Sequence, residues 1–145
     1  IGYVYGPEKI IASLYKLQQH LITSCNSFVQ AAAALVLKEP AAKEVLSYWK
    51  DWEEKTRFVA NELNSIPGIS CPMPEGAFFV WADIKKLRIP SQEFVESLLK
   101  EEKVALVHGS SFGENGEGYF RMTCSKTWDD NRGGLERIRK FVERL

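Results

Sequence analysis

The stretch EVLSYWKDWEEKTRFVANELNSIPG, residues 44–68, decides how this chain folds. Its apolar and small residues recur at every third or fourth position, which is the period of one helical face. Charged residues occupy the other faces, and Pro67-Gly68 ends the pattern. The pattern predicts one long helix whose stripe belongs to a core, and it places two tryptophans there as core residues rather than as a ligand platform. The stripe consists of Val45, Trp49, Trp52, Thr56, Val59, Leu63 and Ile66.

Beyond this helix the period shortens to that of β-strands. Ala77-Phe-Phe-Val-Trp-Ala82 is apolar on both faces, which predicts a buried strand. Residues 104–107 predict a short buried strand, and residues 119–124 predict the last strand. Two further helices are expected, one capped by Ser91 and the other by Asp129 or Asp130.

The segment before the long helix is also regular. Residues 1–5 are rich in β-formers and are closed by Gly6-Pro7, which predicts a strand followed by a helix through Leu17. Residues 27–38 are rich in alanine and apolar nearly all round, which predicts a helix buried between layers. The predicted class is therefore mixed α/β, with a small, mostly antiparallel sheet covered by helices.

The composition excludes several classes of partner. Lys and Arg number 19, Asp and Glu also number 19, and no segment concentrates the basic residues, so nucleic acid is not expected as a partner. No apolar run approaches the roughly 20 residues that span a bilayer. Cys25, Cys71 and Cys124 are odd in number and widely spaced, which favours free thiols, a cytoplasmic location and no metal site.

One residue stands out as a candidate for recognition. In Tyr119-Phe-Arg-Met-Thr-Cys124 the residues alternate, so Arg121 lies on the face opposite Phe120, Met122 and Cys124. A guanidinium on a rigid strand suits two-point binding of a carboxylate. The pattern alone still favours a surface salt bridge for Arg121. It also favours structural roles for His20 and His108, and a plain connection for the glycine-rich loop at residues 109–118.

Several segments together resemble one family. They are Ile1-Gly-Tyr-Val-Tyr-Gly-Pro7, Asn26-Ser-Phe-Val-Gln-Ala-Ala32, Pro74-Glu-Gly-Ala-Phe-Phe79, Val107-His-Gly-Ser-Ser-Phe-Gly113 and Gly116-Glu-Gly-Tyr-Phe-Arg121. In order and spacing the chain resembles the C-terminal part of class I aminotransferases, the fold type I pyridoxal-phosphate enzymes similar to aspartate aminotransferase.

The resemblance implies roles for individual residues. Arg121 matches the arginine that binds the α-carboxylate of the substrate. Phe78 matches an aromatic position near the substrate, and Asn26 lies in a segment close to the neighbouring subunit's active site in the family dimer. It further implies that residues 1–41 are the end of the large pyridoxal-phosphate domain, 42–66 an interdomain helix and 67–145 the small C-terminal domain.

The chain also departs from the family. His108 stands where the family usually has proline, which leaves the path of the following loop open. The Schiff-base lysine and the phosphate-binding arginine of the family would precede Ile1, so no catalytic and no cofactor-binding residue is expected here. Lys126 follows the substrate arginine and is not a substitute. Because the family arginine would stand directly before Ile1, where a trypsin-like protease could cut, a proteolytic or crystallised fragment of a larger enzyme is expected.

The expected function follows from the resemblance. The chain is expected to contribute α-carboxylate recognition of an amino acid or 2-oxo acid in a homodimeric parent that uses pyridoxal 5'-phosphate. By itself it is expected to be inactive and to hold no covalently bound cofactor. Two alternatives stay open: a lyase or synthase of the same fold, and a non-catalytic interaction module that keeps the small-domain fold.

Overall fold

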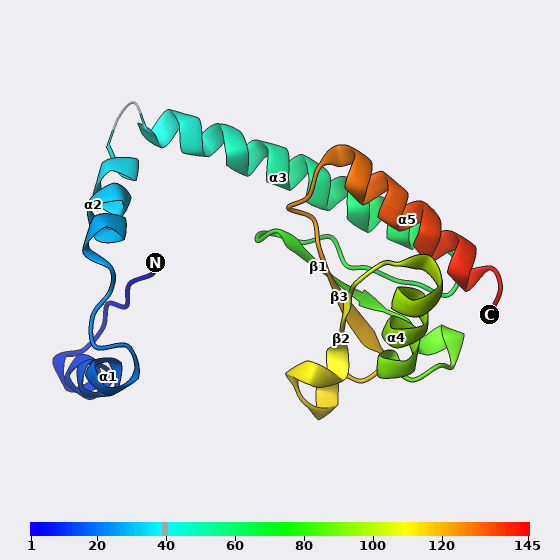
Figure 1. The fold of residues 1–145 in the computed structure, drawn as a ribbon, viewed down its shortest axis with the longest axis horizontal. Helices are drawn as coiled ribbons and strands as arrows, with labels where there is room; N and C mark the ends of the chain where they lie inside the picture. Colours follow the sequence, from blue (N-terminus) through cyan, green and yellow to red (C-terminus); the bar gives the residue numbers. More distant parts are fainter. Residues whose placement is uncertain (39–40) are drawn as a thin grey trace. The chain divides into compact units, whose positions relative to one another are not determined.

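A computed structural model describes residues 1–38 and 41–145 (Figure 1). The chain divides into two compact units, Ile1–Tyr48 and Trp49–Leu145. The long helix α3 (Ala41–Asn64) runs through the boundary between them and confirms the single helix predicted from the stripe. Among the described helices, none is both long and apolar enough to cross a membrane.

The first unit contains two helices, α1 (Glu8–Leu21) and α2 (Ser27–Val36). The strand predicted for residues 1–5 is wrong, because this segment has no regular structure and its apolar side chains are exposed, with Tyr5 at 95%. A strand needs a partner for its backbone groups, and no described residue pairs with this segment. The burial predicted for residues 27–38 is also wrong, since α2 has no buried residue.

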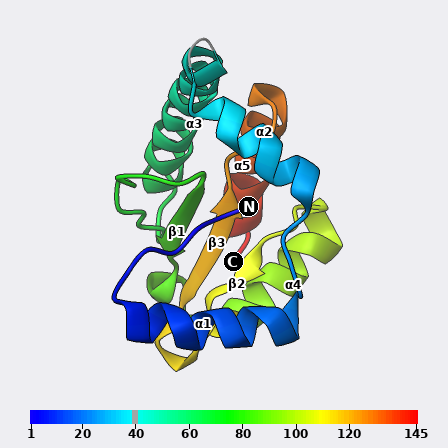
Figure 2. The same ribbon diagram turned by 90° about the vertical axis from the view of Figure 1, so that its left-hand side faces the viewer.

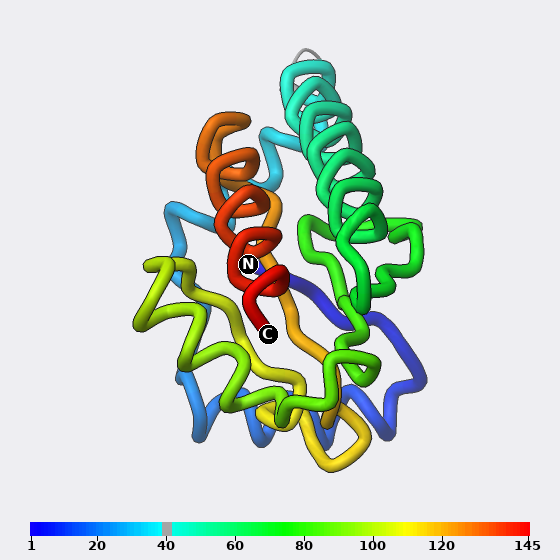
Figure 3. Tube along the Cα trace, turned by 90° about the vertical axis from the view of Figure 1, so that its right-hand side faces the viewer, coloured from blue at the N-terminus to red at the C-terminus, as the bar shows by residue number. Residues whose placement is uncertain are grey.

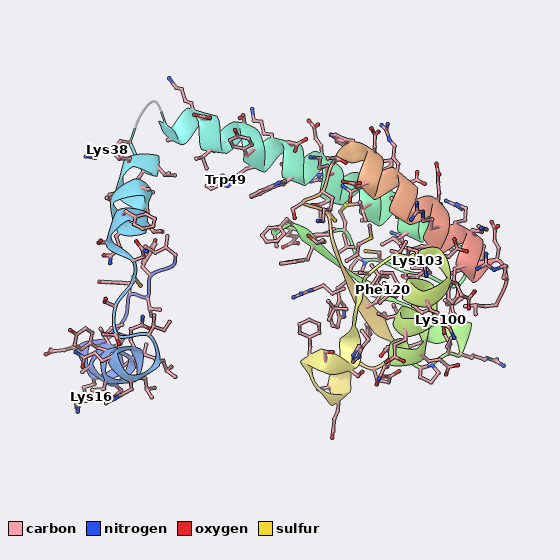
Figure 4. All side chains as sticks on the ribbon, in the orientation of Figure 1. Lys16, Lys38, Trp49, Lys100, Lys103 and Phe120 are labelled. Carbon is pink, nitrogen blue, oxygen red and sulfur yellow. The ribbon has the colours of Figure 1, made fainter. Side chains whose placement is uncertain are left out.

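The stripe on α3 is core only in its second half. Val59 and Leu63 are fully buried, whereas Trp49, labelled in Figure 4, is 57% exposed. The prediction that both tryptophans are core residues is therefore wrong for Trp49. A helical period identifies the apolar face of a helix but not how far a partner extends along that face.

Three antiparallel strands form the sheet of the second unit. Their order is β1-β3-β2, so β3 is paired on both sides, as Figure 2 shows. The strands are β1 (Phe79–Asp83), β2 (Val107–His108) and β3 (Tyr119–Thr123). The predicted small antiparallel sheet is confirmed. The ladder extends slightly beyond these bounds, because the Cys124 backbone N–H donates to the Phe78 carbonyl at 2.8 Å.

Three helices cover one face of this sheet. They are α3, α4 (Ser91–Glu102) and α5 (Trp128–Val142), and Figure 3 shows α5 lying between α4 and α3. The core forms where Val80 and Ala82 of β1 and Phe120 and Met122 of β3 meet these helices. Phe120, labelled in Figure 4, stacks on Phe94 of α4 with 5.7 Å between ring centroids.

The caps of two helices differ from those predicted. Thr127, not an aspartate, caps α5, because its side chain accepts a hydrogen bond from the Asp130 backbone N–H at 3.1 Å. Ser91 is the first residue of α4, and Pro90 occupies the cap position. The N-terminus of α4 receives its hydrogen-bond acceptor from a residue distant in sequence, which belongs to the site described next.

Candidate functional site

Arg121 lies in the middle of the central strand. Its backbone is in register with Trp81 of β1 on one side and Val107 of β2 on the other. The alternation predicted from the sequence is confirmed, since Phe120 and Met122 are buried while Arg121 is half-buried on the opposite face. The position of the Arg121 backbone is thus fixed from both sides.

Two aromatic rings contact the guanidinium of Arg121. Its central carbon Cζ lies 4.5 Å from the ring centroid of Phe79 and 4.8 Å from that of Phe112. Within residues 1–38 and 41–145, none of the hydrogen bonds or ion pairs uses its N–H groups. The surface salt bridge favoured by the pattern alone is therefore wrong. A half-buried guanidinium with five uncommitted donors is suited to an external acceptor.

More rings extend this face of the sheet. Trp81 meets Phe112 edge-on at 5.4 Å and stacks on Tyr119 at 5.7 Å between ring centroids. At the far side of Tyr119, Lys85 Nζ donates to the Tyr119 hydroxyl at 2.8 Å and lies 3.7 Å from Asp83. The Tyr119 hydrogen bond raises the pKa of Lys85. The Lys85 ammonium group is thus already hydrogen-bonded and ion-paired, whereas the Arg121 guanidinium has no such partner among the described residues.

A glycine-rich loop carries Phe112 to Arg121. It forms two short 3-10 helices, η2 (Gly109–Phe112) and η3 (Glu114–Gly116). Gly109 and Gly116 pack backbone to backbone, so a Cβ on either residue would overlap the carbonyl of the other. Only glycine allows this approach. The loop is therefore a closed structure of defined shape rather than the plain connection that composition favours.

The end of this loop also caps α4. The Glu117 carboxylate accepts from the Ser91 backbone N–H and from the Ser91 hydroxyl, both at 2.8 Å. The bond from the backbone N–H is the largest cause that lowers the pKa of Glu117. An acidic side chain at a helix N-terminus also interacts favourably with the helix dipole. The loop and α4 are thereby joined at a buried serine.

His108 has a backbone conformation that a proline could also adopt. Its φ of −67° is the value that a proline ring imposes. Its imidazole Nδ1 lies 2.7 Å from the Ser110 hydroxyl, and its Nε2 lies 2.9 Å from the Ser111 hydroxyl. These side-chain hydrogen bonds connect His108 to the first turn of the loop.

Phe78 lies next to this site and faces a cavity. Its ring contacts Phe79 at 4.2 Å and Trp52 of α3 at 5.5 Å. It lines a cavity of about 380 Å³ together with Trp49, Trp52, Glu53 and Arg57. Phe79 therefore connects Phe78 to Arg121, while the cavity itself is not lined by Arg121.

Asn26 has a local structural role in the first unit. Its side-chain Oδ1 accepts from the Phe28 backbone N–H at 3.2 Å and caps α2. Asn26 belongs to the first unit, whereas Arg121 and Phe78 belong to the second. Its expected closeness to a neighbouring subunit stays a prediction.

Sequence reasoning missed the aromatic residues around Arg121. Phe79 and Trp81 share the face of Arg121 only because of the strand register, and Phe112 reaches it through the loop fold. The alternation in residues 79–83 indicated that Phe79 and Trp81 share one face of their strand, but not that this face carries Arg121. Phe112 had no periodic signal, because it lies in a loop.

The described surroundings of Arg121 are mainly aromatic. The nearby Lys85 amine is bound to Tyr119 and Asp83. Across the described ranges, no group of three or more His, Cys, Asp or Glu side chains could hold a metal ion. What the arrangement can do chemically is bind an anion at Arg121.

Comparison with known proteins reveals extended similarity. A family model described as aminotransferase class I and II matches residues 1–138. The chain is 33% identical over 144 residues to an aspartate aminotransferase of Pyrococcus horikoshii, covering 99% of this chain and 37% of the relative. It is 36% identical over 142 residues to an LL-diaminopimelate aminotransferase of Maridesulfovibrio salexigens, covering 97% and 35%. The chain thus spans little more than a third of the length of these relatives.

Solved structures show the same relationship. The crystal structure of an aromatic aminotransferase from Pyrococcus horikoshii matches with a TM-score of 0.85 and 32% identity, covering 97% of this chain and 38% of the other. An aspartate aminotransferase from Rhizobium meliloti matches with a TM-score of 0.77 and 29% identity, covering 97% and 37%. The arrangement of helices and strands described above is therefore shared with these proteins.

Proposed function

Because the chain belongs to the class I and II aminotransferase family, we propose that it forms the carboxylate-binding part of an aminotransferase. Arg121 binds the α-carboxylate of an amino acid or 2-oxo acid. We further propose that the chain alone has no transaminase activity. The parent protein uses pyridoxal 5'-phosphate, which supplies the electron sink for amino-group transfer.

One observation carries this proposal. Arg121 has a rigid backbone in a central strand, a side chain held against two rings and no internal partner among the described residues. A cation left without a partner in a half-buried position costs free energy unless a ligand supplies the missing charge. A carboxylate matches the guanidinium with two parallel hydrogen bonds. The chain's own contribution to the reaction is therefore to bind and orient the substrate.

The proposal also assigns the parts of the chain to domains of the parent protein. We assign residues 1–41 to the large domain, 42–66 to the interdomain helix and 67–145 to the small domain of a homodimeric parent. The exposed apolar side chains of the first unit, such as Tyr3 and Phe28, support this assignment. Such residues are expected where further parts of a protein pack.

The test uses the full-length protein that contains this sequence. Arg121→Ala should lower kcat/KM for the amino acid. The fall should correspond to a loss of about 2–5 kcal/mol in binding free energy, the usual loss for truncating a desolvated ion-pair partner. Arg121→Lys should retain little of the affinity, because an ammonium cannot form the two-point contact. The control is Arg137→Ala, since Arg137 is exposed and donates a hydrogen bond to the Glu102 carbonyl at 3.3 Å. A KM that hardly changes in Arg121→Ala contradicts the proposal.

A further inference from the structure

We propose that Phe112 is a positioning residue, which holds the Arg121 guanidinium in the orientation that receives the substrate carboxylate. This inference rests on the proposed role of Arg121 and adds the residue that prepares it. Phe112 comes from the glycine-rich loop at residues 109–118, and its ring centroid lies 4.8 Å from Arg121 Cζ. Phe79 contacts the same guanidinium from β1 at 4.5 Å.

The exposure of Phe112 sets it apart from the core phenylalanines. Phe94 and Phe120 are fully buried and stack on each other, whereas Phe112 is 51% exposed. Its ring contacts are with Trp81 and Arg121, both on the open face of the sheet. A large apolar side chain gains little stability from such a half-exposed place. Its contribution is therefore to the side chains that it touches.

The ring contacts restrict Arg121 without using its donors. A cation over an aromatic face is attracted to the ring, and the N–H groups stay available for hydrogen bonds. An arginine side chain otherwise has many rotamers, and fixing it on binding costs free energy. Two rings from different elements hold the guanidinium before the ligand arrives. The loss of side-chain entropy of Arg121 then occurs when the protein folds and does not weaken ligand binding.

The loop is built so that Phe112 stays in place. Gly109 and Gly116 pack against each other at its base, and Glu117 is bound to Ser91 at the start of α4. Ser110 connects the two parts, with its hydroxyl 3.4 Å from that of Ser91 and 2.7 Å from His108 Nδ1. These contacts hold the start of η2 and the end of the loop, and Phe112 is the last residue of η2.

The experiment compares three substitutions in the full-length protein. Phe112→Ala removes the ring, Phe112→Leu keeps an apolar side chain without a π face, and Phe112→Tyr keeps the ring. We expect Phe112→Ala and Phe112→Leu to raise KM for the amino acid about three- to thirty-fold with little change in kcat, and Phe112→Tyr to remain near wild type. The control is Leu99→Ala, which removes a side chain of similar exposure, 48%, from α4.

A double-mutant cycle with Arg121→Ala separates the two proposals. If Phe112 acts through Arg121, then Phe112→Ala adds no further rise in KM in the Arg121→Ala background. An equal rise in both backgrounds, a rise in Leu99→Ala as large as in Phe112→Ala, or a wild-type KM in Phe112→Leu overturns the positioning role. If Arg121→Ala itself leaves KM unchanged, the proposed function fails instead.

Discussion

The close contact between Gly109 and Gly116 makes a sharp prediction about stability. In Gly109→Ala, the new Cβ would overlap the Gly116 carbonyl oxygen and lie 2.8 Å from the Tyr119 carbonyl oxygen. Both obstacles are backbone atoms, so no side-chain rotation relieves the overlap. Either the loop opens or the end of β3 shifts. Both responses disturb the contacts that place Phe112.

The magnitude follows from the usual cost of overpacking. Inserting a methyl group where packed backbone cannot yield costs about 1–3 kcal/mol in the free energy of unfolding. The matched control is Gly133→Ala, because Gly133 lies inside α5 and a Cβ there meets no atom within 4 Å. Replacing glycine by alanine inside a helix should stabilise the protein by about 0.5–1 kcal/mol. The same chemical change is thus expected to have opposite signs at the two positions.

The assay is urea unfolding of the chain, followed by tryptophan fluorescence. All four tryptophans, at positions 49, 52, 81 and 128, lie in the second unit, so the signal reports on the unit that contains both glycines. The unfolding midpoint should fall for Gly109→Ala and rise for Gly133→Ala, with the slope unchanged. A Gly109→Ala variant as stable as wild type would refute the backbone contact and the closed form of the loop.

Two further predictions concern titratable groups. Because the Ser91 contacts lower the pKa of Glu117 in the folded state, their stabilisation is present above the ordinary carboxyl pKa and is lost as the pH falls through the lowered value. As the pH falls from about 5 to 3, the thermal unfolding midpoint of wild type should therefore decrease more steeply than that of Glu117→Gln. The control is Glu114→Gln, which replaces an exposed acid of the same loop and should behave like wild type. Burial raises the pKa of the Cys71 and Cys124 thiols to about 11, so both stay protonated at pH 8, whereas Cys25 is exposed. A thiol reagent should label one cysteine rapidly in the native chain and three in denaturant, and fast labelling of all three in the native chain would contradict the buried positions.

The sequence predicted the elements of the second unit well, because each has a clear period. The stripe along residues 44–66 indicated a helix, and the alternation around Arg121 separated the core face of β3 from its open face. The same reasoning was wrong for residues 1–5. A β-rich composition describes a tendency, and a strand forms only where another strand accepts its hydrogen bonds.

The candidate site was predictable only in part. Arg121 was found from its strand and from the family resemblance, but its aromatic neighbours depend on contacts between distant parts of the chain. Phe79 on β1 contacts Arg121 on the neighbouring strand β3, and Glu117 accepts hydrogen bonds from Ser91, which lies 26 residues earlier in the sequence. No local period encodes such contacts. The use of Glu117 of the loop as a cap for α4 could be seen only in the fold.

The central place of β3 also has a consequence for the timescales of motion at the site. Because β3 is paired on both sides, its backbone amides should belong to the slowest-exchanging group of the second unit, which opens only with its global unfolding. The Arg121 side chain on the same strand is half-buried and lies against the rings of Phe79 and Phe112, so its motion is more restricted than the picosecond-to-nanosecond rotamer exchange of exposed side chains. One residue thus combines a backbone that is almost immobile with a side chain of restricted motion. A ligand meeting Arg121 encounters a guanidinium that is already oriented, on an anchor that does not move.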